Sequence, residues 1–478
     1  MADSHLLLDA ETRDQLWRKL VEAIETYTTK LEGSRVTPPL DPARLRASLS
    51  RFDFAAPVDA LEALDFLVEG LWKFQTHTPH PRYYGLFNPA PTTMGIAGDA
   101  LTAAFNPQLA AWSHSPLAIE IEQHLVRAFG ARFGYDPART DGTFASGGME
   151  ANHTAVLTAL VEKFPEFARR GLRALAAQPV FYVSTEAHHS LLKAARMCGL
   201  GTDAVRQIRA DNDLRMDPEA LASEIARDRG QGFAPFLVVA TAGTTSAGAI
   251  DPLPAIAEIA AREKLWFHVD AAWGGAAALV PELRPLLDGI ERADSIIFDA
   301  HKWLSVPMGA GIYITRNTDI LDRTFRIAQT YMPREAAGLD VIDPYTHSMQ
   351  WSRRAIGLKV FLSLAVAGWE GYATAIRHMV AMGALLRQQL EASGWQVVNK
   401  TPLPVCCFVD QRHPEGRSEA YLHKIAMQVV ASGKAWISTT RLAGSVPVLR
   451  ACITNYRTEA SDIEALIAAL EGARSQVS

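Results

Sequence analysis

The chain has 478 residues, 48% of them hydrophobic, with 47 basic and 52 acidic side chains and a net charge of −5. This length supports a large core and two or three domains. The charge balance argues against nucleic acid or an anionic membrane as a partner. No apolar run reaches the roughly 18 residues of a membrane span, and the acidic N-terminus is unlike a signal peptide. The four cysteines form no CxxC pair, so we expect a soluble cytoplasmic protein with reduced, buried thiols.

The predicted elements begin with helices. DPARLRASLSRF (41–52) opens with an aspartate at the N-cap, and ALEALDFLVEGLWKF (60–74) has apolar residues at helical spacing. A proline-rich loop follows at 77–92, and a helix returns at 117–134. We assign residues 1–85 to an N-terminal helical segment.

From about residue 140, short apolar runs alternate with helical stretches. The runs are VFYVS (180–184), FLVVATA (236–242), LWFHVD (265–270), SIIFDA (295–300) and GIYIT (311–315). This alternation predicts an α/β fold with a mostly parallel central sheet flanked by helices. Later strand-like runs and a last helix predict a smaller α/β domain, so the expected division is a large domain over 86–365 and a small one over 366–478.

Polar residues follow several of these predicted strands. Asp270, Lys302, Thr245 and His188 each come just after an apolar run. Ligands in such sheets bind beyond the carboxyl ends of the strands. We therefore expect these four side chains to share one edge of the sheet.

Lys302 and Asp270 make a chemically meaningful pair. The simplest interpretation of Lys302 in SIIFDAHKWL alone is a surface lysine, and that of Asp270 in HVDAAWGG alone is a helix cap. A partly desolvated lysine can instead form a Schiff base with an aldehyde cofactor, and a buried aspartate can hold the protonated nitrogen of a pyridine ring. The two lie 32 residues apart, one strand–helix–strand step, so each strengthens the cofactor interpretation of the other.

The stretch FASGGMEANHTA (144–155) is a candidate phosphate site. Gly147 and Gly148 precede a predicted helix that begins near Glu150. A glycine-rich turn at a helix N-terminus offers N–H groups and a positive dipole end to an anion, although glycines also mark ordinary turns. Thr245 would add a hydroxyl at another strand end.

His188 and His189 are adjacent, which raises the question of a metal. Neighbouring side chains on a helix diverge by about 100°, and no carboxylate stands at ligand spacing, so we expect no metal. A helix-capping or core histidine remains open, as does an imidazole stacked over a cofactor ring.

HVDAAWGG together with ADSIIFDAHKWL resembles the pyridoxal-phosphate-dependent group II amino acid decarboxylases. The resemblance runs from about residue 75 to about 365. It implies the type I fold of pyridoxal-phosphate enzymes, as in aspartate aminotransferase, and pyridoxal 5'-phosphate as cofactor. It also implies an obligate homodimer with a shared active site, in which the N-terminal helices wrap the partner.

The resemblance also implies roles for individual residues. Lys302 matches the Schiff-base lysine, Asp270 the aspartate on the pyridine nitrogen, and His188 the histidine stacked on the ring. The remaining matches are Ala272 beside the ring, Gly147, Gly148 and Met149 around the phosphate, Thr245 as a cofactor contact, and His301 before the lysine. Asp299 departs from the family, which usually has Asn there next to the phosphate; an Asp could contact a water or stay protonated instead.

Tyr331 bears on the type of reaction. FRIAQTYMPREAAG (325–338) resembles the catalytic loop of these decarboxylases, and Tyr331 falls where their catalytic tyrosine protonates the substrate carbon. Relatives with Phe at this position produce an aldehyde instead. The resemblance therefore implies a decarboxylase that releases carbon dioxide and a primary amine.

The substrate is less constrained. HPRYYGLFNPAPT (80–92) resembles the substrate-pocket loop, with Leu86 and Phe87 in it, and Ser352 stands where relatives use Ser for phenols and Gly for indoles. These residues favour an aromatic, tyrosine-like amino acid. A diamino or other small amino acid, an aldehyde synthase, aldolase or transaminase reaction, and a non-catalytic paralogue are the alternatives.

Overall fold

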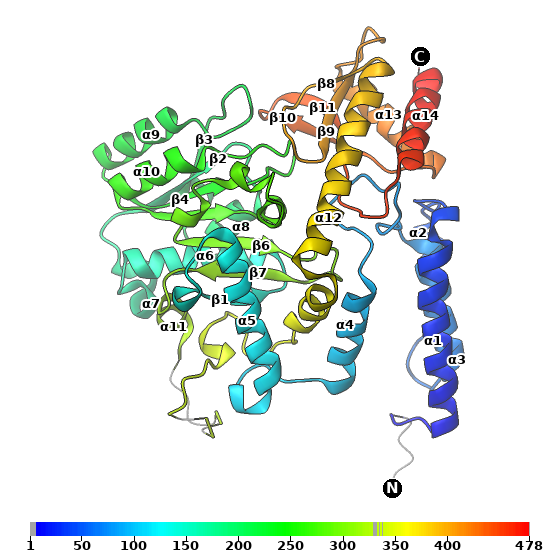
Figure 1. Cartoon of the computed structure of the whole chain (residues 1–478), viewed down its shortest axis with the longest axis horizontal. Helices are drawn as coiled ribbons and strands as arrows, with labels where there is room; N and C mark the ends of the chain where they lie inside the picture. Colours follow the sequence, from blue (N-terminus) through cyan, green and yellow to red (C-terminus); the bar gives the residue numbers. More distant parts are fainter. Residues whose placement is uncertain (1–5, 328–331, 334, 337, 478) are drawn as a thin grey trace.

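A seven-stranded sheet forms the centre of the computed structural model, which describes residues 6–327, 332–333, 335–336 and 338–477 (Figure 1). Its order is β1-β7-β6-β5-β4-β2-β3. The strands are β1 (Asp141–Ala145), β2 (Pro179–Ser184), β3 (Val205–Ile208), β4 (Ala234–Thr241), β5 (Trp266–Asp270), β6 (Ser295–Asp299) and β7 (Gly311–Thr315). Neighbours from β6 to β3 pair in parallel, and β7 is antiparallel to both of its neighbours. The predicted mostly parallel sheet is confirmed.

Helices cover both faces of this sheet, because its strands are apolar on both sides. Along β6, Ile296 and Phe298 join the core under α5, α9 and α10, while Ile297 points into the core under α6 and α8. The helices of this part are α4 (Thr93–Phe105), α5 (Pro116–Phe133), α6 (Gly148–Lys163), α7 (Phe167–Arg170), α8 (Ser190–Met197), α9 (Pro218–Gly230), α10 (Leu253–Glu263) and α11 (Ile320–Phe325).

A second, antiparallel sheet follows in the order β10-β11-β9-β8. Its elements are β8 (Trp395–Val397), β9 (Val405–Asp410), β10 (Ser438–Leu442) and β11 (Val446–Cys452), with α13 (Glu419–Ser432) and α14 (Ala460–Val477). The long helix α12 (Gly357–Ala392) runs from the large sheet to the small one (Figure 1). The domain boundary expected at 365/366 falls inside α12, close to Gly368, where φ of 63° breaks the helical geometry; the division into domains stays a prediction.

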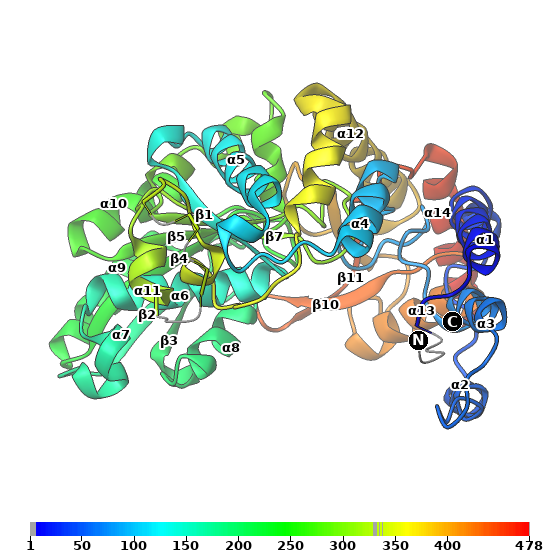
Figure 2. The ribbon, with the colours of Figure 1, turned by 90° about the horizontal axis from the view of Figure 1, so that it is seen from below.

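The β10–β11 hairpin reaches from the small sheet toward the large one (Figure 2). The backbone N–H of Ala443 donates to Glu186 at 2.8 Å, and Thr440 bonds Ser246 at 3.1 Å. These contacts fasten the hairpin to the loops after β2 and β4, so the small sheet forms one wall above the carboxyl ends of the central strands.

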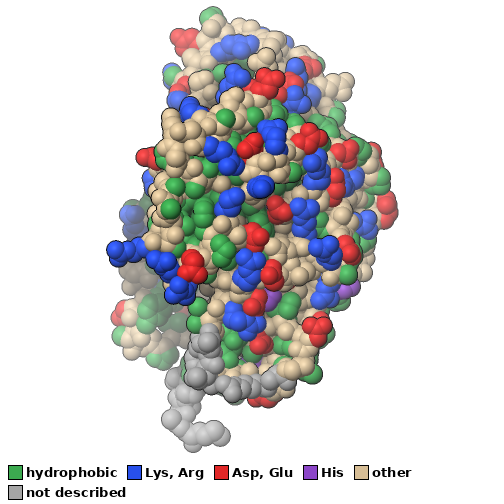
Figure 3. Space-filling view, turned by 90° about the vertical axis from the view of Figure 1, so that its left-hand side faces the viewer, with side chains coloured by type: hydrophobic (Ala, Val, Ile, Leu, Met, Phe, Trp, Pro, Cys, Tyr) green, Lys and Arg blue, Asp and Glu red, His purple; other side chains and the backbone are tan. Residues whose placement is uncertain are grey.

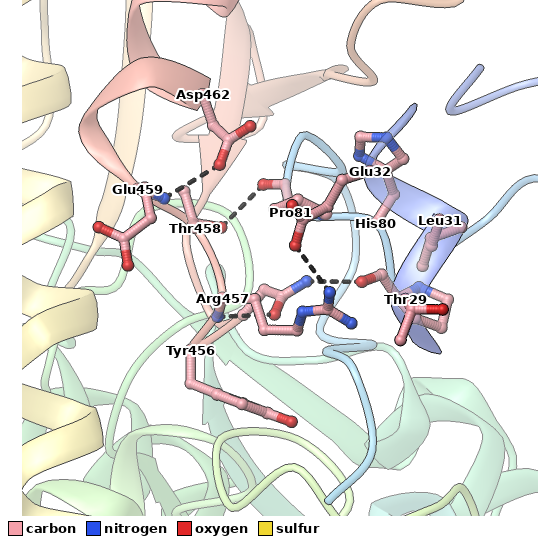
Figure 4. A network of polar contacts seen from close by, with 12 residues as sticks. Thr29, Leu31, Glu32, His80, Pro81, Tyr456, Arg457, Thr458, Glu459 and Asp462 are labelled. Atoms are coloured by element: carbon pink, nitrogen blue, oxygen red, sulfur yellow. Dashed lines mark hydrogen bonds and ion pairs between the residues drawn. The ribbon is translucent and has the colours of Figure 1, made fainter. Parts of the chain in front are cut away.

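The helices α1 (Ala10–Lys30), α2 (Pro42–Leu49) and α3 (Ala60–Phe74) lie at one end of the molecule, away from the central sheet (Figures 1 and 2). None of their described residues is buried. A polar network fixes the turn after α1 and the loop after α3 to the loop before α14 (Figure 4). In it Arg457 pairs with Glu32 at 2.7 Å, and the Thr458 hydroxyl donates to the Pro81 carbonyl at 2.8 Å.

The face beside α9, α10 and α7 carries basic and acidic side chains interspersed with one another (Figure 3). Such mixing produces no large field of one sign on that face. Among the helices that the structure describes, none has the length and apolar character needed to cross a bilayer.

Candidate active site

The parallel pairing of β5 and β6 brings two predicted site residues together. Asp270 ends β5 in register with Ile297 of β6. Beyond the strand ends, the Asp299 N–H donates to the Ala272 carbonyl at 2.9 Å. This bond holds the turn that carries Lys302 beside the turn that follows Asp270, as predicted from strand order.

Lys302 lies in a confined but accessible position. Its side chain is 23% exposed, and its Nζ lies 2.9 Å from Asp299 Oδ2. The Nζ also lies 5.9 Å from the centre of the Phe87 ring. Trp303, the next residue, is buried against Trp273. The amine is therefore flanked by one carboxylate and by apolar surface.

The glycine loop after β1 packs directly on the end of β6. A Cβ atom on Gly148 would lie 2.8 Å from Asp299 Oδ2, and one on Gly311 would lie 2.7 Å from the Gly147 backbone. Helix α6 begins at Gly148, two residues before the predicted start, and no side chain caps it. Its first N–H groups are thus available to an anion, and the close packing explains why this loop needs glycine.

Asp299 is 1% exposed, and its Oδ1 has no hydrogen-bond partner among the described residues. His301 lies nearby, with Nε2 3.9 Å from Asp299 Oδ2 and with Nδ1 accepting from the Ala310 N–H at 3.1 Å. Burial lowers the pKa of His301, against the opposing attraction of Asp299. A buried carboxylate with an unpaired oxygen thus stands where the family pattern has an amide.

Asp270 is held by two donors. Asn152 Nδ2 donates to its Oδ2 at 3.0 Å, and the Ala272 N–H donates to its Oδ1 at 3.2 Å. His188 faces the same edge, and its Nδ1 accepts from the Ser190 N–H at 3.2 Å. Burial lowers the pKa of His188; Asp270 raises it, and Lys302 lowers it further. His188, Asp270 and Lys302 therefore act on one another electrostatically.

Phe87, Thr245 and Arg450 meet at the wall made by the small sheet. Phe87 is buried and stacks on Trp273 with ring centres 4.7 Å apart. The Arg450 guanidinium lies 5.1 Å from the Phe87 ring centre and donates to the carbonyls of Thr245 and Gly85. The hairpin strand β11 thus contributes a buried positive charge to this wall.

The other predicted residues lie in different surroundings. Leu86 is 56% exposed, and Met149 packs partly buried against the core under α6. Ser352 lines a separate pocket of about 310 Å³, where its hydroxyl accepts from Gln108. Tyr331 lies outside the described residues. Within the described ranges, no cluster of three or more His, Cys, Asp or Glu side chains could hold a metal.

Three residues beside the site were not singled out from the sequence. Asn152 contacts Asp270, His268 contacts Asn152 at 3.2 Å, and Arg450 contacts the Thr245 loop. His268 had a usable signal, since it stands two residues before Asp270 and so shares a strand face with it. Asn152 and Arg450 reach the site only through the tertiary fold.

Comparisons with known proteins identify the class. Residues 50–410 match the family described as "Pyridoxal-dependent decarboxylase conserved domain". The chain is 31% identical to an aromatic-L-amino-acid decarboxylase of Bacillus atrophaeus, over 99% of this chain and 98% of that protein. It is 34% identical to the cysteine sulfinic acid decarboxylase of Mus musculus over 70% and 68% of the two chains. Crystal structures of Oryza sativa TDC with PLP and tryptamine and of mouse CSAD superpose with TM-scores of 0.91 and 0.90. They have identities of 25% and 28%, and each alignment covers 98% or more of both chains.

The chain therefore belongs to the pyridoxal-dependent decarboxylase family. It is an amino acid decarboxylase of the type I fold, and its cofactor is pyridoxal 5'-phosphate. The residues present fit this cofactor. A glycine cradle at an uncapped helix start suits the phosphate, and Lys302 and Asp270 stand at neighbouring strand ends to meet the aldehyde and the ring nitrogen.

Asp299→Asn tests the carboxylate that packs against the glycine cradle. Asn keeps the shape but removes a negative charge beside the site expected for a dianionic phosphate, so we expect the cofactor-free protein to bind pyridoxal phosphate about three- to tenfold more tightly. Titration of the cofactor-free protein measures this. Asp294→Asn is the matched control. It removes a charge just before the start of β6, away from the glycine loop, and should leave the affinity unchanged. Weaker binding by Asp299→Asn would contradict the repulsion and assign the carboxylate a supporting contact.

Proposed function

We propose that the enzyme removes the carboxylate of an aromatic, tyrosine-like L-amino acid as carbon dioxide and releases the primary amine. The observation that carries this proposal is the aromatic wall beside Lys302. Phe87 is stacked on Trp273 with an interplanar angle of 24°, and the Lys302 amine lies 5.9 Å from the Phe87 ring centre. A flat apolar surface so close to the amine suits an aromatic side chain. The Bacillus relative, which aligns along nearly the whole chain, is named for aromatic substrates.

The side chains at the strand ends divide the chemistry. When bound, pyridoxal phosphate supplies a ring that accepts the electron pair left at Cα as the carboxylate departs. Lys302 holds the cofactor through its ε-amine. Asp270, fixed by Asn152 and by the Ala272 N–H, keeps a proton at the ring nitrogen. The buried aromatic side chains exclude water, which favours departure of a desolvated carboxylate.

His188 has a defined proton to offer. Because its Nδ1 accepts from the Ser190 N–H, the neutral imidazole carries its hydrogen on Nε2. That hydrogen can be donated to a substrate carboxylate or toward Cα. Tyr331 is the residue that we assign to deliver the proton to Cα at the end of the reaction.

An acidic amino acid is the second candidate substrate. Arg450 is 2% exposed, and its guanidinium donates to the backbone carbonyls of Thr245 and Gly85, with no carboxylate paired to it in the described part of the chain. A buried positive charge next to Phe87 attracts a carboxylate or sulfinate. The mouse relative is named for cysteine sulfinic acid. The aromatic wall favours the first candidate, and Arg450 favours the second.

We also propose a homodimer in which residues 1–85 bind the partner. The helices α1 and α3 expose Trp17, Val21, Leu67 and Leu71. An apolar groove of about 400 Å³ lies between these helices and the start of α4. Helices that expose apolar side chains and bury no residue of their own need a second surface to cover them.

The buried thiols of Cys406, Cys407 and Cys452, which form no disulfide, support a cytoplasmic location.

A product screen tests the reaction. The screen covers the common amino acids, the ring-hydroxylated ones and the diamino acids. For each amino acid that reacts, we expect carbon dioxide and amine in equal amounts. We expect the highest rate with a phenolic substrate. Peroxide formed in step with carbon dioxide would identify an aldehyde synthase, and the highest rate with an acidic amino acid would establish the second candidate.

Tyr331→Phe tests the assigned proton donor. Without the phenol, the electron pair at Cα remains available to dioxygen, so amine should fall by about 10²-fold or more. Aldehyde, ammonia and hydrogen peroxide should appear in its place. Tyr345→Phe is the control, since Tyr345 packs on Trp351 in the segment that follows. Unchanged amine release by Tyr331→Phe would contradict the assignment.

Sedimentation of the full chain tests the assembly. We expect a dimer for the native protein and a shift toward monomer for Leu71→Glu, because a buried charge in an apolar interface is costly. Leu172→Glu changes an exposed leucine just after α7, at the end of the molecule away from α1 (Figure 1), and should stay dimeric. A native monomer would contradict the shared active site.

A further inference from the structure

A chain of buried polar side chains leads to Asp270 from below the site. Trp266 Nε1 lies 2.9 Å from Ser295 Oγ, which lies 2.8 Å from His268 Nδ1. His268 Nε2 lies 3.2 Å from Asn152 Oδ1, and Asn152 Nδ2 lies 3.0 Å from Asp270 Oδ2. All five side chains are at most 7% exposed. Buried polar groups at this density require a consistent set of donors and acceptors.

The chemistry of the two ends sets the direction of every bond. An ionised Asp270 only accepts, so Asn152 presents its amide nitrogen to Asp270 and its oxygen to His268. His268 must then donate from Nε2, which leaves Nδ1 as an acceptor. The Ser295 hydroxyl donates to that Nδ1, and the Trp266 N–H, which can only donate, bonds the Ser295 oxygen. Every hydrogen in the chain therefore points toward Asp270.

A neutral His268 is required for this arrangement. Complete burial lowers the pKa of His268 to about 4, against the opposing pull of Asp270, so the ring carries a single hydrogen at neutral pH. The competing tautomer would donate from Nδ1 to the Ser295 carbonyl at 3.1 Å. It would place a lone pair of Nε2 against Asn152 Oδ1, and the amide would have to turn its oxygen toward Asp270.

We infer that Trp266, Ser295, His268 and Asn152 are positioning residues that act as one polarised hydrogen-bond chain on the Asp270 carboxylate. Bonds aligned in one direction strengthen one another, and donors aimed at a carboxylate favour its charged form. A carboxylate held ionised leaves the shared proton on the cofactor nitrogen. This inference rests on the proposed role of Asp270 at that nitrogen.

Asn152 also connects this chain to the ring-stacking histidine. Its second amide hydrogen donates to Ser190 Oγ at 2.9 Å, and the Ser190 N–H donates to His188 Nδ1. One amide at the start of α6, next to the glycine cradle, thus orients groups expected at the nitrogen and at the face of the ring.

Ser295→Ala tests the chain from a residue that does not contact Asp270. Without the hydroxyl, His268 is free to adopt the competing tautomer, and Asn152 loses its orientation. Binding of pyridoxal phosphate to the cofactor-free protein should weaken about tenfold. Binding of the analogue in which C–H replaces the ring nitrogen should not change, because it has no nitrogen for Asp270 to hold.

Two further variants keep the test decisive. The preference is the affinity for pyridoxal phosphate divided by the affinity for the analogue. Trp266→Phe removes the first donor of the chain and should reduce this preference by about two- to threefold. Tyr135→Phe removes a buried hydroxyl that bonds the Ala293 carbonyl at 2.8 Å and should leave the preference intact. Thermal melting of each cofactor-free variant separates folding defects from binding defects.

The outcomes distinguish the chain from the role of Asp270. If Ser295→Ala weakens both ligands equally, or neither, the chain does not act on the ring nitrogen and the inference is overturned. If the native protein itself binds both ligands equally, the assignment of Asp270 to the nitrogen fails first. A loss of preference in Ser295→Ala, with the preference kept in Tyr135→Phe, supports the inference.

Discussion

The parallel pairing of β5 with β6 is the constraint on which the rest of the site depends. It places Asp270 and the turn carrying Lys302 at the same edge of the sheet. The Asp299 N–H then closes the two turns onto one another. Backbone hydrogen bonds in the middle of a sheet are rigid, so the two side chains keep their separation without help from flexible loops. The glycine cradle, His188 and the small-sheet wall are all arranged around this pair.

Titratable groups from three ends of central strands, together with Arg450 of the small sheet, surround Lys302. Asp299 pairs with the amine, Asp270 and His188 stand across from it, and Arg450 lies behind Phe87. Burial makes the charged groups among them act strongly on their neighbours. The buried position of the Asp299 carboxylate also explains Gly148, since any Cβ at that residue would push against it. One carboxylate thus lies against both the glycine loop and the Lys302 amine.

The sequence predicts the central sheet and the pair Lys302 and Asp270, but it does not predict the tertiary contacts that surround this pair. The apolar runs predicted β2, β4, β5, β6 and β7 because strands buried on both faces are apolar throughout. The strand β1 contains a glycine and threonine, and β3 is four residues long with Arg206 and Gln207 inside, so neither has that signal. Asn152 and Arg450 approach the site from α6 and β11. Their partners lie more than 100 residues away in the sequence, so no local pattern predicts these contacts. Ser352 lies in a pocket apart from Lys302 in the single chain, and a shared dimer site is what would give it a role.

Covalent attachment of the cofactor at Lys302 is the central claim of this account. Borohydride treatment of the cofactor-loaded enzyme makes that attachment permanent, and peptide mass spectrometry then locates it. We expect the mass increment on the peptide that contains Lys302, with none on the peptide that contains Lys359, the buried lysine that bonds Asp99 and the Met308 carbonyl. An increment on another lysine, or no increment at all, would contradict the account.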